Sequence, residues 1–166
     1  SEELDAGIAQ LLADSNPDLI EDRETRLSLV FDYIRDNFRY LPMPHYDAGT
    51  DDWAQEAAEV FLRQGKGNCY CFAGLFMYCA RQLGYQAYVV AGWESNPTND
   101  HAWTMIDRDG QSYLYDVNNG NGVYVVSVVS DPDNLGSDEK GIMVKGPNAL
   151  AQYPYGSMNV GANFWM

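Results

Sequence analysis

The hydrophobic pattern of this chain changes its period at Gly84. Before that glycine, apolar residues recur at the three- and four-residue intervals of amphipathic helices. After it, short apolar runs separated by turn residues are typical of strands. Helices that come first and strands that come second are typical of an α+β fold with an antiparallel sheet. The order of the two patterns therefore predicts that fold class.

The boundaries of the expected elements follow from the same patterns. The expected helices cover residues 3–14, 24–38, 51–65 and 69–83. Proline or glycine residues come after each of these helices, and Gly84 is the expected cap of the last one. The expected strands cover residues 85–92, 101–107, 111–117 and 123–130. Residues 131–166 contain many Gly, Pro and Asn residues, which predicts loops with room for one edge strand.

The length and the net charge of the chain limit the classes of protein to which it can belong. The 166 residues fit one domain, and no internal repeat or interdomain linker divides them. A net charge of -14 disfavours nucleic acid as a partner, because contacts to a phosphate backbone need clustered Lys and Arg. No apolar run is long enough to cross a bilayer, so no membrane-spanning segment is predicted.

The start of the chain leaves its compartment open. Ser1 leads directly into an acidic helical segment, without a cationic, hydrophobic or small-residue signal pattern. The chain does not begin with Met, which is compatible with the removal of a targeting segment. No location is predicted, and an extracytoplasmic or cell-surface location stays open.

The three cysteines lie close together in the sequence, at Cys69, Cys71 and Cys79. An odd number so closely spaced does not indicate a disulfide framework. Cys69 and Cys71 are two residues apart, which places them on nearly opposite sides of a helix, so we expect no bridge between them. A common fate of free cysteines is to be small buried hydrophobic residues, and all three fit that interpretation.

One of the three cysteines also fits a catalytic interpretation. Cys69 comes directly after the break made by Gly65 and Gly67 and begins a predicted helix. The unpaired N–H groups and the dipole of a helix N-terminus favour a thiolate, which is a better nucleophile than a thiol. Cys69 also lies near the apolar stripe of the helix, and Cys71 is expected to point away from it. Cys71 and Cys79 are expected to be structural.

A cysteine nucleophile needs a base, and the chain has two histidines, His45 and His101. His101 begins a predicted strand, and the turn at residues 108–110 folds Asp116 back beside it, within reach across the two strands. A carboxylate there can hold the imidazole in one tautomer while its other nitrogen faces Cys69. His45 follows Pro44 in a polar stretch and is expected to be an ordinary loop residue.

Several segments resemble those of the transglutaminase-like superfamily. "GNCYCFAGLFMYCARQLGYQAYVVAG" resembles the cysteine segment of that family, "HAW" its histidine segment and "YLYDVNN" its aspartate segment. "RLSLVFDYIRDNFRY" looks like the helix that precedes the cysteine, so the resemblance covers about residues 24–130. It implies a papain-like α+β core, with N-terminal helices and the cysteine-bearing helix packed on an antiparallel sheet. It also implies Cys69 as nucleophile, His101 as acid and base, and Asp116 as the orienting residue.

Other features of the family carry over less directly. The backbone N–H of Cys69 is the expected first oxyanion donor, and Tyr40 or Trp53 is a candidate for the second. Cys71 stands where many members of the family have an acidic or polar residue. The chain has no calcium-loop motif, and it lacks the additional β-domains of large animal transglutaminases. Calcium activation is therefore not implied.

These observations predict a cysteine-dependent acyl-transfer enzyme that acts on peptide or carboxamide bonds through a thioester, without a cofactor. Hydrolysis is favoured over amine transfer because water needs no dedicated site. The expected substrate is a peptide or protein, and the acidic surface favours a cationic or lysine-rich partner. A protein-crosslinking transglutaminase and a catalytically silent interaction module are the alternatives. A metal site is disfavoured because the thiols of Cys69 and Cys71 point apart.

Overall fold

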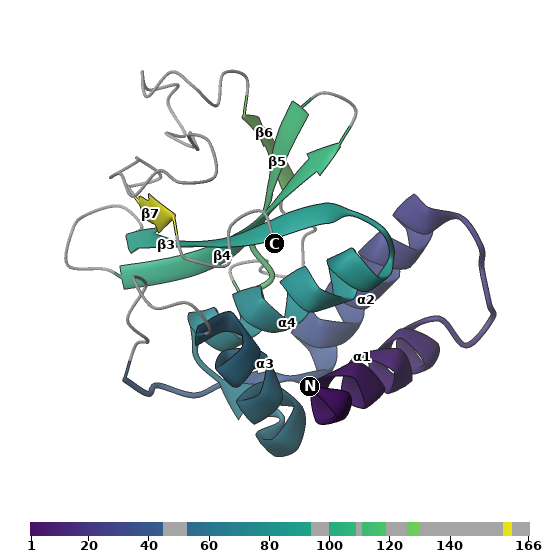
Figure 1. Ribbon diagram of the computed structural model, residues 1–166, viewed down its shortest axis with the longest axis horizontal. Coiled ribbons are helices and arrows are strands. Elements are labelled where there is room, and N and C mark those ends of the chain that lie inside the picture. The colour runs from purple at the N-terminus through teal and green to yellow at the C-terminus, as the bar shows by residue number, and fades with distance from the viewer. Residues whose placement is uncertain (45–52, 94–99, 109–110, 119–125, 130–157, 161–166) are drawn as a thin grey trace.

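A computed structural model describes residues 1–44, 53–93, 100–108, 111–118, 126–129 and 158–160. His45 and the turn residues 109 and 110 lie outside the described residues. The described chain contains helices and an antiparallel sheet and has an α+β papain-like fold, as the sequence predicts (Figure 1). None of the described helices combines the length and the hydrophobicity that a membrane crossing requires.

The helices predicted from the sequence are present. Their bounds are Glu2–Ser15 for α1, Arg23–Asn37 for α2, Trp53–Gln64 for α3 and Cys69–Gln82 for α4. Polar side chains cap three of their N-termini, because the first N–H groups of a helix lack partners in the helix. Ser1 caps α1 by accepting from the Leu4 N–H, and Asp22 caps α2 by accepting from the Thr25 N–H. Asn68 caps α4.

The main sheet is antiparallel, with strand order β6-β5-β4-β3-β7. Its strands are Gln86–Trp93 (β3), Asp100–Arg108 (β4), Gln111–Tyr115 (β5), Val126–Val129 (β6) and Met158–Val160 (β7). The predicted strands from Tyr85 to Ser130 correspond to β3 through β6. The single edge strand expected within residues 131–166 corresponds to β7, which pairs with β3.

A second, two-stranded sheet was not predicted. β1 (Arg39–Tyr40) runs parallel to β2 (Lys66–Gly67), so that Tyr40 lies opposite Gly67. Strands of two residues are too short to show an alternating pattern, and their pairing depends on the packing of α2 and α3. The pair joins the end of α2 to the segment just before α4.

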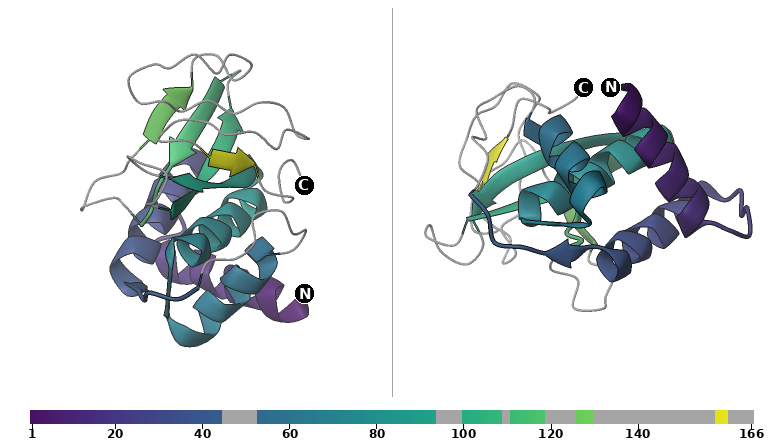
Figure 2. Two further views of the ribbon diagram at one scale, coloured as in Figure 1. Left: turned by 90° about the vertical axis from the view of Figure 1, so that its left-hand side faces the viewer. Right: turned by 90° about the horizontal axis from the view of Figure 1, so that it is seen from below.

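Helix α4 lies between the sheet and the other helices. It packs against β3 and β4 on one side, and against α1, α2 and α3 on the other (Figures 1 and 2). Every residue from Cys69 to Met77 is buried. Cys71, which is expected to point away from the apolar stripe, is therefore buried as well, because this part of the helix is covered on all sides.

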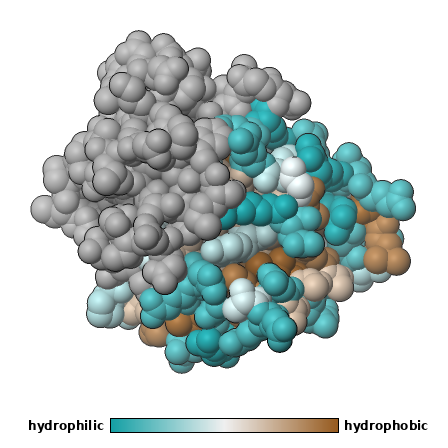
Figure 3. Space-filling view, viewed as in Figure 1, coloured by the Kyte–Doolittle hydropathy of each residue, from teal (hydrophilic) through white to brown (hydrophobic). Residues whose placement is uncertain are grey.

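Aromatic rings join the layers. The ring of Phe76 on α4 lies 5.5 Å from Phe31 on α2 and 5.5 Å from Tyr115 on β5. On the outside, the described surface in Figure 3 is mostly hydrophilic, with hydrophobic groups over the helical half. The exposed large hydrophobic residues of the described chain are Leu19, Ile20 and Tyr40. Tyr40 is the one that belongs to the β1–β2 pair.

Candidate active site

The first turn of α4 is organised by Asn68. Its buried side chain accepts hydrogen bonds from the N–H groups of Tyr70 (3.1 Å) and Cys71 (3.3 Å). Its backbone carbonyl accepts from the Phe72 N–H at 3.2 Å. Asparagine is favoured as an N-cap because its short amide can reach these groups.

This cap leaves the N–H of Cys69 as the remaining donor of the turn. Within the part of the chain that the structure describes, no group accepts a hydrogen bond from it. An N–H at a helix N-terminus is well suited to bind an anion, because the helix dipole favours negative charge there. The sulfur of Cys69 and a backbone N–H that can bind an anion therefore lie together at the N-terminus of α4, where the helix dipole is positive.

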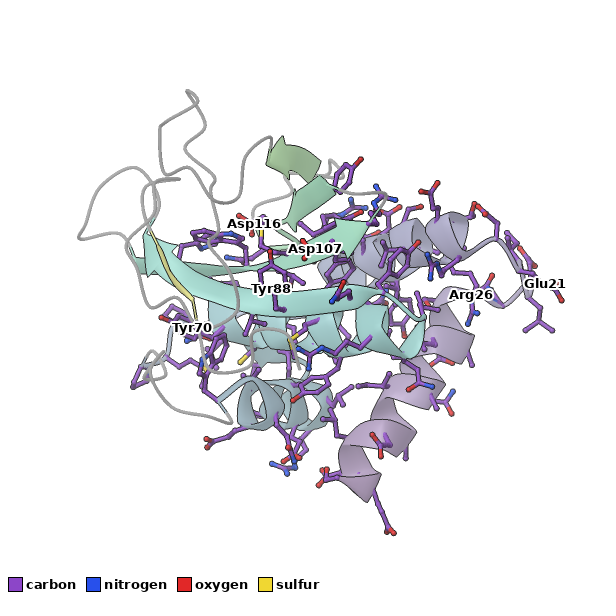
Figure 4. All side chains as sticks on the ribbon, turned by 45° about the horizontal axis from the view of Figure 1, so that its top comes forward. Glu21, Arg26, Tyr70, Tyr88, Asp107 and Asp116 are labelled. Carbon is purple, nitrogen blue, oxygen red and sulfur yellow. The ribbon has the colours of Figure 1, made fainter. Side chains whose placement is uncertain are left out.

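His101 and Asp116 form a buried pair on the sheet. The Nε2 atom of His101 and the Oδ2 atom of Asp116 are 2.7 Å apart. The register of β4 and β5 pairs Thr104 with Tyr115, so Asp116, the next residue, lies two places from His101 across the strands. Figure 4 shows Asp116 beside the sheet and Tyr70 toward the N-terminal end of α4.

The structure also brings His101 to Cys69. A side-chain hydrogen bond joins the two residues. Because Nε2 is taken by Asp116, Nδ1 is the ring nitrogen left for the sulfur. The three residues that the sequence singles out, from α4, β4 and the end of β5, thus form one hydrogen-bonded chain.

Opposing effects act on the pKa of the His101 imidazole. Burial lowers the pKa of its imidazole, but the hydrogen bonds to Asp116 and Cys69 and the charges of those two residues raise it to about 10. The protonated ring is therefore favoured in the folded protein, held between two acceptors. An imidazolium next to a cysteine is an environment in which catalytic thiolates form.

The other two cysteines lie in the core. All three cysteines are free and buried. Burial raises the pKa of the Cys79 thiol far above its ordinary value. Cys71 lies beneath Gly67, where an added Cβ would come within 2.6 Å of its sulfur. Glycine is therefore required at this point, because the backbone of β2 passes directly over the helix.

The two oxyanion candidates occupy different surroundings. Tyr40 is 52% exposed. Its burial, and then the charge of Cys69, raise the pKa of the phenol, which places Tyr40 within electrostatic range of the sulfur. Trp53 is buried at the start of α3, and its ring lies 4.9 Å from that of Tyr70. Its indole is a packing neighbour of the residue next to Cys69.

Sequence reasoning missed two residues that position the site. Thr104 on β4 donates a buried hydrogen bond of 2.8 Å to the carbonyl of Ala73, which fixes the strand of His101 to the helix of Cys69. Asn68 also donates weakly to the carbonyls of Met43 (3.5 Å) and Pro44 (3.4 Å). An asparagine just before a predicted helix is a recognisable cap signal, whereas nothing in the sequence distinguishes Thr104 from other strand threonines.

No metal centre is formed by the described residues. Among them, no three His, Cys, Asp or Glu side chains are grouped as metal ligands. The chemistry available to the described site is that of a thiol, an imidazole, a carboxylate and hydrogen-bond donors.

Comparisons with known proteins agree with this architecture. Residues 12–116 match the family model of the transglutaminase-like superfamily. One similar solved structure is a TGase, with a TM-score of 0.54 and 18% identity over 70% of this chain and 31% of that one. Another is a candidate cysteine protease from Cytophaga hutchinsonii, with a TM-score of 0.50 and 19% identity over 72% of this chain and 41% of that one. This chain thus spans less than half of either protein. A search of curated proteins finds no sequence match.

Proposed function

Because the chain belongs to the transglutaminase-like superfamily, we propose that it is a cysteine-dependent acyl-transfer enzyme acting on peptide or carboxamide bonds. The observation that carries this proposal is the hydrogen-bonded chain of Cys69, His101 and Asp116 at the N-terminus of α4. Such a chain of nucleophile, base and orienting carboxylate is the arrangement that nucleophilic acyl transfer needs.

In the first half of the reaction, the proton of the Cys69 side chain lies on His101, in line with the protonated ring described above, and the sulfur attacks the carbonyl carbon of the substrate. The carbon–sulfur bond forms, and the carbonyl electrons move to the oxygen. When that oxyanion collapses, the bond to the leaving nitrogen breaks, and His101 returns the proton to the departing amine or ammonia. The acyl group is then held as a thioester on Cys69.

In the second half, the acceptor attacks the thioester. His101 takes a proton from water or an amine as the new bond to the acyl carbon forms. The carbon–sulfur bond breaks, its electrons return to the Cys69 sulfur, and His101 keeps the proton, which restores the starting state. His101 thus acts as acid in the first half of the cycle and as base in the second.

Asp116 is proposed to act through His101. Its Oδ2 atom accepts from Nε2, which holds the imidazole in the tautomer that presents Nδ1 to Cys69. Its charge also stabilises the imidazolium that forms when the proton leaves sulfur. Asp116 is therefore an orienting residue.

The oxyanion is proposed to bind to the N–H of Cys69. The Asn68 cap leaves that group available, as the geometry of the first turn supports. The Tyr40 hydroxyl is the second donor that we favour, because it is partly exposed and lies within electrostatic range of Cys69. Trp53 remains the alternative, and its buried position against Tyr70 favours a packing role.

Water is the acceptor that we propose, which makes the protein a hydrolase of the protease or amidase type. Water needs no binding site of its own, whereas an amine must be concentrated beside the thioester to compete with it. A crosslinking transglutaminase is the second candidate function. The one observation in its favour is the net charge of -14, which would attract proteins whose lysine side chains serve as the amine acceptor.

Titrating an amine against a fixed acyl donor separates these two functions. An N-acylated peptide p-nitrophenyl ester serves as donor, and the ratio of amide product to free acid is measured as a primary amine is added. We expect a small amide share that rises linearly with the amine. A saturable preference for one amine would indicate a transglutaminase instead. If Cys69→Ala turned over the donor as fast as the wild type, the protein would not be a cysteine enzyme.

A further inference from the structure

Helix α4 is hydrogen-bonded to the sheet near each of its ends. Near its start, the buried hydroxyl of Thr104 on β4 donates to the carbonyl of Ala73 at 2.8 Å. Near its end, the Nε atom of Arg81 donates to the carbonyl of Ala87 on β3 at 2.8 Å. We call the bond of Thr104 the near contact and the bond of Arg81 the far contact, because they lie at different distances from Cys69.

The near contact lies close to the place where Cys69 and His101 meet. Ala73 follows Cys69 by four residues, which is about one helical turn or 6 Å along the axis. Thr104 follows His101 by three residues, which is about 10 Å along the strand. Arg81, by contrast, is about 18 Å along the helix from Cys69. The near contact therefore joins the helix and the strand of the proposed triad beside the triad itself.

The residues of β4 on either side of Thr104 make apolar contacts. Strand residues two apart lie on the same face of a sheet, and Ala102 and Ile106 are both buried in the hydrophobic core together with α4. Apolar packing has no preferred direction, so it does not fix the position of the strand along the helix. A hydrogen bond from Thr104 to a single carbonyl does fix it, because the bond forms over a narrow range of distance and angle.

The hydroxyl of Thr104 is not required to complete the hydrogen bonding of the core. In an α-helix the Ala73 carbonyl also accepts from the N–H of Met77, and it keeps that partner when the hydroxyl is absent. A valine at position 104 has nearly the same shape and leaves no polar atom without a partner. The polar side chain is thus better explained by the position that it fixes than by the stability that it adds.

From the near contact we propose that Thr104 is a positioning residue of the reaction, whose hydroxyl holds β4 at the point along α4 where the His101 ring reaches the Cys69 sulfur. Thr104 acts through His101 and does not touch the substrate. A displacement of about 1 Å between reacting groups can lower a rate about 100-fold, so one bond at this place is enough to affect catalysis. The inference rests on the proposed function and adds a residue to its mechanism.

Pairs of side chains at position 104 isolate the effect of the hydroxyl. Thr104→Val replaces it by a methyl group, and Thr104→Ala lacks the hydroxyl that Thr104→Ser keeps. With an N-acylated peptide p-nitrophenyl ester as donor, we expect kcat/KM to be about tenfold lower in Thr104→Val than in the wild type. The same difference is expected between Thr104→Ala and Thr104→Ser. The alanine and serine pair decides the question if the valine variant does not fold.

The far contact supplies the matched control. Arg81→Met removes the donor from the same helix and keeps an unbranched side chain that can pack in its place. We expect the free energy of unfolding to fall and kcat/KM to stay close to that of the wild type, because the lost bond is far from Cys69. Equal losses of kcat/KM in Arg81→Met and Thr104→Val would show that any loosening of α4 slows the reaction. That result would overturn the inference.

The pKa of His101 reports the position of its ring, which a purely structural role of Thr104 would not change. Burial lowers that pKa, and the hydrogen bonds and charges of Asp116 and Cys69 raise it. We expect the midpoint of the His101 signal in an NMR titration to fall in Thr104→Val, because the ring moves away from the sulfur. In Thr104→Ser and Arg81→Met the midpoint should match that of the wild type.

The outcomes separate this inference from the proposed function. A folded Thr104→Val protein with the kcat/KM of the wild type, or with an unchanged His101 midpoint, would overturn the inference and leave the proposed function intact. If the ester does not acylate Cys69 in the wild-type protein, the proposed function itself is contradicted, and the role of Thr104 in the reaction with it.

Discussion

At the scale of single residues, the site depends on how His101 is held. Asp116 is hydrogen-bonded to the Nε2 atom of the ring, and the side chain of Cys69 is hydrogen-bonded to the ring as well. The sequence predicted His101 and Asp116 because a turn and an alternating pattern indicate which strand residues face each other, and Cys69 because it begins a predicted helix after a glycine-rich break. It could not predict Thr104, whose bond to Ala73 sets the distance between strand and helix, because that contact depends on packing between elements distant in sequence.

Replacing Asp116 tests its orienting role. Asp116→Ala should lower kcat by orders of magnitude, because the imidazole loses the partner that fixes its tautomer. Asp116→Asn is the matched control, because it keeps the shape of the side chain and removes its negative charge. Turnover by stopped assay and folding by circular dichroism are the measurements. A folded Asp116→Ala protein with unchanged kcat would remove the residue from the proposed mechanism.

The charge of His101 can be measured directly. The folded-state pKa of about 10 lies above the ordinary 6.5, so protonated His101 stabilises the fold fully below pH 6.5 and progressively less as the pH rises toward 10. Of the two histidine signals in an NMR titration, the one lost in His101→Gln should have its midpoint well above 6.5. In Asp116→Asn that midpoint should fall. A wild-type midpoint near or below the ordinary value would contradict the buried ion pair.

At the scale of elements, the sequence predicted the four helices and the order in which strands follow them, because each has its own period. What it could not predict is how deeply α4 is buried. Every residue from Cys69 to Met77 is covered, although the spacing of the apolar residues suggested a single buried stripe. The parallel pair of β1 and β2 was also missed, because two-residue strands have no pattern of their own.

The close contact of α3 with α4 predicts a sensitive position. An added Cβ at Gly74 would lie 2.8 Å from the backbone carbonyl oxygen of Ala54. Gly74→Ala should therefore lower the free energy of unfolding by about 1–3 kcal/mol, since a helix must shift to accept the methyl group. Urea unfolding measures the change.

Gly7→Ala is the matched control for that substitution. There the new Cβ would meet the Cδ1 atom of Leu62 at 2.7 Å, at the far end of a flexible side chain that can rotate away. Alanine also favours a helix over glycine by up to about 1 kcal/mol. Gly7→Ala should thus be near neutral, and a larger loss there than at Gly74 would contradict the packing described for α3 and α4.

At the scale of the whole molecule, the charge is the feature that bears on substrates. With 24 acidic and 10 basic residues, the chain has a net charge of -14. Such a field attracts cationic partners and is screened by salt. The net charge follows from the sequence alone, because it does not depend on the fold, and a preference for cationic partners is what it predicts.

Salt dependence tests that preference. For two donor peptides that differ only in flanking Lys or Glu residues, kcat/KM should be higher for the lysine peptide at low ionic strength. The advantage should shrink as potassium chloride is raised to about 0.3 M, because the Debye length falls below about 8 Å there. An unchanged ratio across this range would show that charge does not guide substrate binding.

The central claim is that Cys69 forms a thioester, and mapping the acyl group tests it most directly. The protein is mixed with an activated acyl donor, quenched in acid within the first turnover and analysed by peptide mass spectrometry. We expect the added acyl mass on the peptide that contains Cys69, its removal by hydroxylamine, and its absence in Cys69→Ala. Acylation of Cys71 or Cys79 instead, or turnover that persists in Cys69→Ala, would contradict the account.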